Sequence, residues 1–281
     1  QEIKAIFHQE LDPLFGKEEV DHFFYGSVEH YLGLERFILA LRPQYTLTKK
    51  EVPPFFEALA RLKQQEPLQY ILRETLFMDL CIKVDARVLI PRPETEELVR
   101  WIFEECQPEV DKCHILDMGT GSGCIALALK KHLPNARVSG MDASREALEL
   151  AQENAEHHQI EVDFHYGDIL AMDAGAYPPL DVVVSNPPYV RQREKGQMQM
   201  NVLAHEPEMA LFVADEDPLL FYRHIAIFAM DTLVKGGHLF LEINQYLAQS
   251  MVELLQSHNF EHITVKKDIF GNDRMIKAEK P

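Results

Sequence analysis

The tetrapeptide Asn186-Pro187-Pro188-Tyr189 has the residue types needed to hold a planar –NH2 group. It directly follows the apolar run Val182–Val184, which is typical of a strand buried on both faces. Neither proline has a backbone N–H to continue a strand ladder, so we predict a stiff turn with Asn186 and Tyr189 at its rim. The Asn186 oxygen and the Pro187 carbonyl can accept the two protons of an –NH2 group, and Tyr189 can stack on its plane. A strand that simply ends in a Pro-Pro turn is the alternative.

A glycine-rich turn lies between a predicted strand at 114–116 and a predicted helix with an apolar stripe from Ile125 to Leu133. Glycines at a strand-to-helix turn let a ligand approach the backbone closely. A dinucleotide fingerprint requires Gly or Ala at its last position, where this chain has Cys124. Alternate glycines after an acidic residue are instead similar to the S-adenosylmethionine loop of class I methyltransferases. The candidate cofactor-binding residues here are Asp117, Gly119, Thr120, Gly121, Ser122 and Gly123.

Two further acidic residues follow candidate strands. Asp142 ends the predicted strand 137–142, 19 residues past Gly123, where a carboxylate can accept both hydroxyls of a ribose. Asp168 follows the predicted strand 162–166, where it can accept a hydrogen bond from an adenine amine. Each carboxylate alone also fits a solvated loop, but their places at successive strand ends favour a nucleoside ligand.

A doubly wound sheet would bring these residues together. In such sheets, ligands bind beyond the carboxyl ends of the strands, where the strand order reverses. We predict that the first and fourth strands, which end at the glycine loop and at Asn186, are neighbours, so that both motifs face one crevice. Downstream segments predict a helix at 221–233, a turn at 235–237, a strand at 238–243, a helix at 247–255 and an antiparallel pair at 263–267 and 275–278.

The chain before this sheet divides into two parts. Residues 1–66 carry apolar positions at helical spacing in 3–15, 20–32 and 55–62, which predicts a small helical bundle. Residues 67–90 predict a linker with a hairpin or a pair of short strands, and residues 91–281 form the domain with the ligand motifs. A merely structural extension is the alternative role for the bundle.

Two other segments adjoin the predicted crevice. Residues 91–96 precede a helix that is predicted to begin at Glu97, and Arg92 and Glu94 are expected near the crevice. A turn and helix N-terminus without a ligand role is the alternative. Residues 190–216 form a long polar loop directly after Tyr189. Since long loops in compact domains are usually functional or disordered, we predict a substrate lid there.

The composition argues against nucleic acid and membrane as partners. The 281-residue chain has a formal net charge of −17, and residues 91–281 hold 17 basic against 31 acidic residues. An acidic surface opposes DNA binding and favours a basic protein partner; Arg191, Arg193 and Lys195 are the only basic cluster expected near the site. No apolar run is long enough to span a membrane, and the start of the sequence lacks the pattern of a secretory signal.

The cysteines and histidines indicate neither disulfides nor a metal site. The four cysteines are scattered without a Cys-x-x-Cys pair, which fits reduced thiols. The 13 histidines show no metal-ligand spacing. We therefore expect a cytoplasmic protein without a bound metal, and we expect it to be a monomer.

The chain as a whole resembles the release factor glutamine methyltransferases, the HemK/PrmC family. The Leu-Ile-Pro-Arg-Pro-Glu-Thr-Glu stretch separates this family from amino-methylating DNA enzymes, which share the glycine loop and the Asn-Pro-Pro-Tyr turn. The family often has Gly where this chain has Arg73 and Asp79, a departure that concerns the geometry of the hairpin. The motifs that carry the resemblance are Pro67-Leu-Gln-Tyr-Ile, Val88-Leu-Ile-Pro-Arg-Pro-Glu-Thr-Glu96, Leu116-Asp-Met-Gly-Thr-Gly-Ser-Gly123, Val184-Ser-Asn-Pro-Pro-Tyr189, Glu206-Pro-x-x-Ala-Leu211 and Gly271-Asn-Asp-Arg274.

The resemblance implies an α/β class I methyltransferase domain, Rossmann-like with a mostly parallel seven-stranded sheet and an antiparallel last strand. It also implies that the helical bundle binds the release factor. The reaction would be methyl transfer from S-adenosylmethionine to the side-chain amide nitrogen, N5, of the glutamine in the Gly-Gly-Gln motif of class-1 peptide-chain release factors. S-adenosylhomocysteine would be the second product.

The resemblance also assigns roles to residues already singled out. Asn186, Pro187 and Tyr189 would be catalytic. The substrate would contact Asn186, Pro187, Pro188, Tyr189 and Arg92. The cofactor would contact Asp142, Asp168 and Asn186 in addition to the glycine loop.

Two other functions remain open from the sequence. A DNA or RNA adenine or cytosine amino-methyltransferase would share the Asn-Pro-Pro-Tyr turn, but the acidic charge and the absence of a recognisable target-recognition segment count against it. A non-enzymatic module that binds the cofactor or a release factor would not need a turn that holds an amine.

Overall fold

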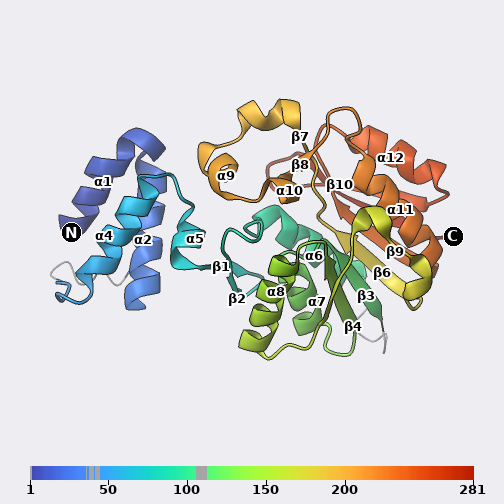
Figure 1. Cartoon of the computed structure of the whole chain (residues 1–281), viewed down its shortest axis with the longest axis horizontal. Helices are drawn as coiled ribbons and strands as arrows, with labels where there is room; N and C mark the ends of the chain where they lie inside the picture. Colours follow the sequence, from blue (N-terminus) through green and yellow to red (C-terminus); the bar gives the residue numbers. More distant parts are fainter. Residues whose placement is uncertain (1, 36, 38–40, 42–44, 106–112) are drawn as a thin grey trace. The chain divides into compact units, whose positions relative to one another are not determined.

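The computed structural model describes residues 2–35, 37, 41, 45–105 and 113–281 (Figure 1). The chain divides into two compact units. One comprises the chain up to Glu74 together with Gln199–His205, and the other comprises Thr75–Met198 and Glu206–Pro281. Within the described ranges, every helix is too short or too polar to cross a lipid bilayer.

The first unit is built from helices. Its helices are α1 (Glu2–Phe15), α2 (Lys17–Leu32), α4 (Val52–Leu62), α5 (Leu68–Leu72) and α9 (Met200–His205). The predicted helices at 3–15, 20–32 and 55–62 are confirmed, each a little longer than the apolar pattern indicated. Glycines with a positive φ stand at both ends of α2: Gly16 has φ +80°, and Gly33, in the left-handed conformation, has φ +62°.

The apolar stripes of these helices meet in one core. Phe7 and Leu11 of α1, Phe24 of α2 and Phe55 of α4 are buried in a single cluster. The Phe7 and Phe24 rings pack edge to face with centroids 5.6 Å apart, an arrangement that aromatic pairs favour. Residue His205 of α9 joins this unit through a 3.2 Å hydrogen bond between its Nε2 and the carbonyl oxygen of Gln64.

The segment predicted as a linker contains a helix as well as the hairpin. Helix α5 occupies its start, and strands β1 (Glu74–Phe77) and β2 (Leu80–Lys83) form the hairpin. Arg73 ends α5 with φ +62°, and Met78 and Asp79 make the hairpin turn with φ +46° and +58°. Glycine adopts these left-handed angles without strain, so Arg73 and Asp79 hold the geometry that the glycines of the family would hold more easily. Helix α5 was missed because five residues are too few to show a helical period.

The second unit is organised around a seven-stranded sheet in the order β10-β11-β9-β6-β3-β4-β5. Neighbouring strands from β9 to β5 are parallel, and β11 runs antiparallel to both β9 and β10. The predicted fold class is thereby confirmed, including the antiparallel last strand. The strands are β3 (His114–Met118), β4 (Arg137–Asp142), β5 (Asp163–Tyr166), β6 (Leu180–Ser185), β9 (Leu233–Glu242), β10 (Glu261–Lys267) and β11 (Asp273–Glu279).

Helices cover both faces of this sheet (Figure 1). On one side lie α6 (Pro93–Glu105), α7 (Cys124–His132) and α8 (Arg145–His158), and on the other lie α11 (Leu220–Thr232) and α12 (Ala248–Ser257). Leu116 and Met118 of β3 share a buried cluster with Tyr222 and Ile225 of α11. Because side chains alternate along a strand, Asp117 points to the other face.

The carboxyl ends of the parallel strands meet at one edge of the sheet. Strand β3 pairs with β6, which confirms that the first and fourth strands of the sheet are neighbours. Strand β9 differs from the prediction, because it begins at Leu233 and includes the glycine pair that was predicted as a turn. Gly236 bonds through its N–H to the Lys280 carbonyl at 2.8 Å, so this stretch is part of the sheet rather than a connection.

The segment 190–216 is not the long loop that its polarity predicted. It contains β7 (Val190–Arg191), the 3-10 helix η3 (Gln192–Gln197), α9, α10 (Glu208–Leu211) and β8 (Phe212–Val213), and β7 pairs with β8 in parallel. Buried Glu194 holds its start: its carboxylate accepts from the Arg191 N–H at 2.9 Å and from the Arg191 guanidinium at 2.7 Å. An ion pair between two residues three positions apart leaves no hydrophobic periodicity in the sequence. The short helices and strands of this segment were therefore not predicted.

Candidate active site

One cavity of about 370 Å³ lies within the second unit, at the carboxyl edge of the sheet. Its walls include five segments that the sequence analysis had indicated. They are the glycine loop (Gly119, Thr120, Gly121 and Ser122), the end of β4 with Asp142, the turn after β5 with Asp168, the Asn-Pro-Pro-Tyr turn with Asn186 and Pro188, and the stretch before α6 with Arg92. The predicted crevice is therefore present, and most of the predicted residues line it.

The glycine loop is held by hydrogen bonds to the neighbouring strand. The N–H groups of Gly119 and Thr120 both donate to the Met141 carbonyl of β4, at 2.8 and 2.9 Å. Gly123 starts α7 with φ +80°, and a Cβ there would lie 3.0 Å from the Phe164 ring and 3.1 Å from the Ala151 Cβ. Gly123 is thus needed for helix-to-sheet packing, and it does not line the cavity.

Asp117 lies beneath the loop rather than in the cavity wall. Its side chain is fully buried, and Oδ2 accepts a 2.6 Å hydrogen bond from the Thr120 hydroxyl. Its Oδ1 has no hydrogen-bond partner among the described residues. Burial is the main reason that the pKa of this carboxyl rises to about 7, and the nearby Asp142 adds to the increase.

Asp142 and Asp168 both line the cavity, as predicted. Asp142 accepts from the Gly121 N–H through Oδ2 and from the Ser144 N–H through Oδ1, both at 2.9 Å. Burial raises its pKa above the ordinary value, and these backbone donors oppose that increase. Asp168 caps a short 3-10 helix, η1 (Ile169–Ala171), by accepting from the Leu170 N–H at 2.9 Å. Each carboxylate is therefore oriented by the backbone, and each oxygen has a further lone pair for a ligand donor.

The Asn-Pro-Pro-Tyr turn places its four residues differently. Asn186 and Pro188 line the cavity, whereas Pro187 is buried and Tyr189 packs against the hydrophobic core. The Tyr189 hydroxyl donates to Glu242 at 2.8 Å, and its carbonyl accepts from Asn244 at 3.0 Å. Tyr189 is thus fixed at both ends, in contrast to the exposed position at the rim that the turn predicted. Burial, followed by the charge of Glu242, raises the Tyr189 pKa well above its ordinary value.

Arg92 lines the cavity next to the buried carboxylate of Glu206, for which the sequence alone indicated no role. Its guanidinium contacts Glu206 Oε1 at 2.6 Å, and the other Glu206 oxygen accepts from the Ile90 N–H at 3.1 Å. Glu206 is 5% exposed, so this carboxylate anchors the chain on the way into α6. The sequence contains the Glu206-Pro motif, but it does not show that Glu206 lies next to Arg92.

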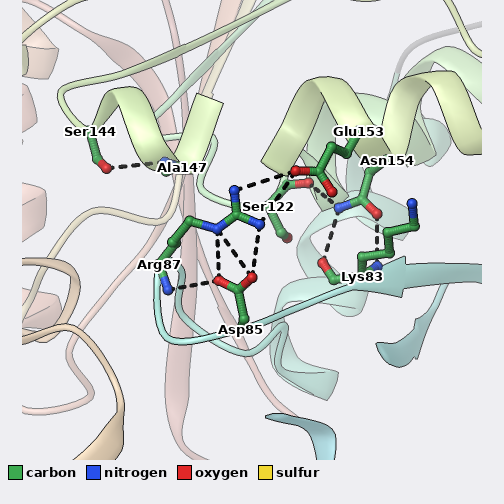
Figure 2. Close-up of polar contacts among 8 residues, drawn as sticks. All are labelled: Lys83, Asp85, Arg87, Ser122, Ser144, Ala147, Glu153 and Asn154. Atoms are coloured by element: carbon green, nitrogen blue, oxygen red, sulfur yellow. Dashed lines mark hydrogen bonds and ion pairs between the residues drawn. The ribbon is translucent and has the colours of Figure 1, made fainter. Parts of the chain in front are cut away.

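Asn154 of α8 fastens the glycine loop to the end of the hairpin (Figure 2). Its Nδ2 donates to the carbonyls of Ser122 at 2.9 Å and Lys83 at 3.1 Å, and its Oδ1 accepts from the Lys83 N–H at 2.7 Å. The side chain is completely buried. One amide therefore satisfies three backbone groups from two segments that flank the cavity.

Arg87 is a second wall residue that the sequence did not reveal. Figure 2 shows its guanidinium between Asp85 and Glu153. It makes a bidentate contact with Asp85, with Nε to Oδ1 at 2.9 Å and Nη2 to Oδ2 at 2.8 Å, and a 3.4 Å contact with Glu153. Arg87 lines the cavity together with Ser144 and Ala147 at the start of α8.

Together these groups can hold a ligand that offers hydroxyl and amine donors to carboxylates and that lies close to a glycine backbone. The Asn186 amide lies in the same cavity, so a second ligand with an –NH2 group can approach the first. Among the described residues, no group of three His, Cys, Asp or Glu side chains is arranged to hold a metal ion.

The buried Asp117 predicts a pH-dependent stability. With its pKa raised to about 7, folded Asp117 holds a proton that the unfolded chain releases near pH 4, so ionisation favours unfolding as pH rises between these values. This effect is at most about 1.4 kcal/mol per pH unit. The stability of Asp117→Asn relative to the wild type should therefore increase as pH rises from about 4 to about 7 and stay level above that range, as measured by denaturant unfolding at each pH. Asp163→Asn, at an exposed position, is the control. A stability difference between Asp117→Asn and the wild type that does not change with pH would contradict the prediction.

The Asn154 network predicts a large effect of a small change. Asn154→Asp keeps the shape of the side chain but removes both donors and sets a carboxylate against two carbonyl oxygens. We expect a loss of about 3 kcal/mol in the free energy of unfolding. Gln152→Glu makes the same chemical change at an exposed position of α8 and should cost less than about 1 kcal/mol. Equal losses in the two variants, measured by urea titration, would refute this account of Asn154.

Comparisons with known proteins agree with this architecture. The family described as the methyltransferase small domain matches residues 99–213, and the PrmC N-terminal domain matches residues 27–72. Among solved structures, the chain is similar to a methyltransferase from Pyrococcus furiosus, with a TM-score of 0.54 and 19% identity over 80% of this chain and 98% of that one. This likeness concerns the fold.

Curated relatives match over almost the full chain. The release factor glutamine methyltransferase of Flavobacterium psychrophilum is 47% identical over 277 residues, which cover 98% of this chain and 97% of that protein. The protein of the same name from Bacteroides thetaiotaomicron is 40% identical and covers 99% of each chain. At this level of identity over nearly every residue, the chain belongs to the release factor glutamine methyltransferase family.

Proposed function

We propose that this protein transfers a methyl group from S-adenosylmethionine to the side-chain amide nitrogen, N5, of the glutamine in the Gly-Gly-Gln motif of class-1 peptide-chain release factors. The observation that carries the proposal is the shared cavity, whose wall contains both the glycine loop and the Asn186 amide. A nucleoside site and an amide-binding turn within one cavity are what methylation of an amide nitrogen requires. Membership of the family supports the same substrate.

The cavity residues fit S-adenosylmethionine. The cavity volume of about 370 Å³ lies within the usual range for cofactor sites. A ligand can approach the backbone of Gly121 closely, because a Cβ there would meet no atom within 4 Å. Asp142 would accept the ribose hydroxyls and Asp168 the adenine amine, while Asp117 would support the loop from below. Thr120, Ser122 and Gly123 would shape the loop, and Asn186 would adjoin the methyl-bearing end.

The substrate amide would be held by the Asn-Pro-Pro-Tyr turn. An amide nitrogen is a weak nucleophile because its lone pair is delocalised into the carbonyl. The Asn186 oxygen and the Pro187 carbonyl would accept its two hydrogens and turn the nitrogen towards the methyl group. The bound cofactor supplies an electrophilic methyl on a sulfonium centre, so positioning provides much of the rate. Pro188 would form the wall of this subsite, and Tyr189, which packs against the hydrophobic core, would stiffen the turn.

Several groups would bind the rest of the protein substrate. Arg92, oriented by buried Glu206, would contact the substrate at the cavity wall. The helical first unit would grip the release factor away from the reacting glutamine, and the segment 190–216 would act as a lid. The formal charge of −17 favours a partner with a basic surface. We further propose that the enzyme acts in the cytoplasm as a monomer, without a nucleic acid or membrane partner.

The substrate prediction is tested by transfer of labelled methyl from S-adenosylmethionine. We expect label on a purified class-1 release factor, none on the same factor with the motif glutamine changed to Ala, and none on duplex DNA. Label on DNA alone would refute the glutamine assignment. Equal label on the wild-type release factor and on its Gln-to-Ala variant would show that another residue accepts the methyl group.

The role of Asn186 predicts a selective loss of rate. Asn186→Ala should lower kcat by at least about 100-fold, since it removes one acceptor that orients the amide nitrogen. The Kd for S-adenosylmethionine, measured by calorimetry, should change less than about threefold, because the loop and carboxylates that hold the cofactor remain. A kcat close to that of the wild type would show that Asn186 does not orient the substrate.

A further inference from the structure

Asn186 is connected to a buried carboxylate on the next strand by one hydroxyl group. Strands β6 and β9 are parallel, and Ser185 pairs with Leu241 in their register. Asn186 directly follows the end of β6, and Glu242, which follows Leu241, is the last residue of β9. Glu242 is 1% exposed, and Asn186 lines the cavity.

Thr95, in the first turn of α6, stands between them. Its hydroxyl donates to Glu242 Oε2 at 2.7 Å and accepts from Asn186 Nδ2 at 3.2 Å. The Thr95 side chain is 2% exposed, so water does not replace either partner. A hydroxyl has a single hydrogen, and Thr95 gives it to the carboxylate; towards Asn186 it can therefore only accept.

The other side of Glu242 is also occupied by a donor. The Tyr189 hydroxyl donates to Oε1 at 2.8 Å, and Tyr189 keeps its proton because its pKa is raised well above the ordinary value. The carboxylate thus accepts at both oxygens. Burial raises the pKa of the Glu242 carboxyl above its ordinary value, and the hydrogen bonds from Thr95 and Tyr189 and the charge of Arg274 oppose that increase. Arg274 itself is held by Asp268, with Nε to Oδ2 at 3.2 Å.

From this geometry we propose that Thr95 and Glu242 are positioning residues that fix the orientation of the Asn186 side-chain amide. The proposal rests on the proposed function and adds two residues to it. With Nδ2 directed at Thr95, Oδ1 is on the opposite branch of the planar amide and is left free to accept. A substrate –NH2 group offers only donors, so it binds an Asn186 that presents oxygen and is repelled by one that presents –NH2.

The two orientations of an asparagine amide have almost the same shape, so packing alone does not select one. Rotating the Asn186 amide by 180° would bring its oxygen to Thr95, which would have to withdraw its hydrogen from Glu242. A buried carboxylate oxygen would then lack a donor, and such groups are strongly unfavourable. The hydrogen bond from Thr95 to Glu242 therefore decides which atom Asn186 shows to the substrate.

A matched pair of variants tests this role. Thr95→Val replaces the hydroxyl with a methyl of similar size, and Thr95→Ser keeps the hydroxyl. We expect Thr95→Val to lower kcat by about 30-fold or more, with the KM for S-adenosylmethionine within about twofold of the wild type and a normal unfolding transition. Thr95→Ser should stay within about threefold of the wild-type kcat. A folded Thr95→Val with normal kcat would overturn the proposal, as would equal losses in both variants.

A second readout separates this proposal from the substrate assignment. Asparagine side chains labelled with ¹⁵N give an Asn186 –NH2 signal that is identified by its absence in Asn186→Ala. In the cofactor-free protein, its hydrogens should exchange with solvent at least about tenfold faster in Thr95→Val than in the wild type or Thr95→Ser. An unchanged exchange rate would overturn the orientation role even if the enzyme is active. If the wild type fails to methylate a release factor but shows this difference, the substrate assignment fails and the orientation role stands.

If Thr95→Val does not fold, Thr95→Ala serves in its place. It removes the hydroxyl without placing a methyl against Glu242. The same exchange measurement then applies, and the same two outcomes support or overturn the proposal.

Discussion

The parallel register of β3, β6 and β9 is the constraint on which the whole site depends. It places the glycine loop, Asn186 and Glu242 at the ends of three neighbouring strands, at one edge of the sheet. A slip of one residue along β6 would turn the side chains of that strand to opposite faces. The apolar residues of β6 are buried between helices on both sides, so hydrophobic burial resists such a slip. The chemistry at the edge is thus secured by apolar packing in the middle of the sheet.

Two buried carboxylates next to the cavity illustrate different uses of burial. Asp117 has one satisfied oxygen and one without a partner, and its pKa is raised to about 7. Glu242 has a donor on each oxygen and lies near a guanidinium. Ionisation of the first group lowers the free energy of unfolding, whereas the second group is satisfied by the donors around it. The site therefore contains both a destabilising and a stabilising carboxyl group, on the two strands that flank β6.

The sequence was sufficient to predict those features that depend only on neighbouring residues in the chain. Val182–Val184 followed by two prolines predicted the end of β6, and alternate glycines after Asp117 predicted the turn into α7. Asp142 and Asp168 were placed in the cavity because they follow strands. The features that were missed depend on contacts between distant residues. Thr95 and Glu242 are 147 positions apart in the chain. In the sequence alone, Glu242 cannot be distinguished from an exposed acidic residue at the end of a strand, because its partners Thr95 and Tyr189 come from other segments. Likewise, the short elements of 190–216 are held by Glu194 and Asn244, which leave no periodic pattern.

The division of the chain into two units has a mechanical consequence. The backbone passes between the units three times, after Glu74, after Met198 and after His205. The last of these crossings is a single peptide bond ahead of Glu206, whose carboxylate holds both Arg92 and the Ile90 N–H. One crossing of the backbone is thus directly joined to a residue that holds the wall of the cavity, and the two units cannot be separated by one cut in the chain.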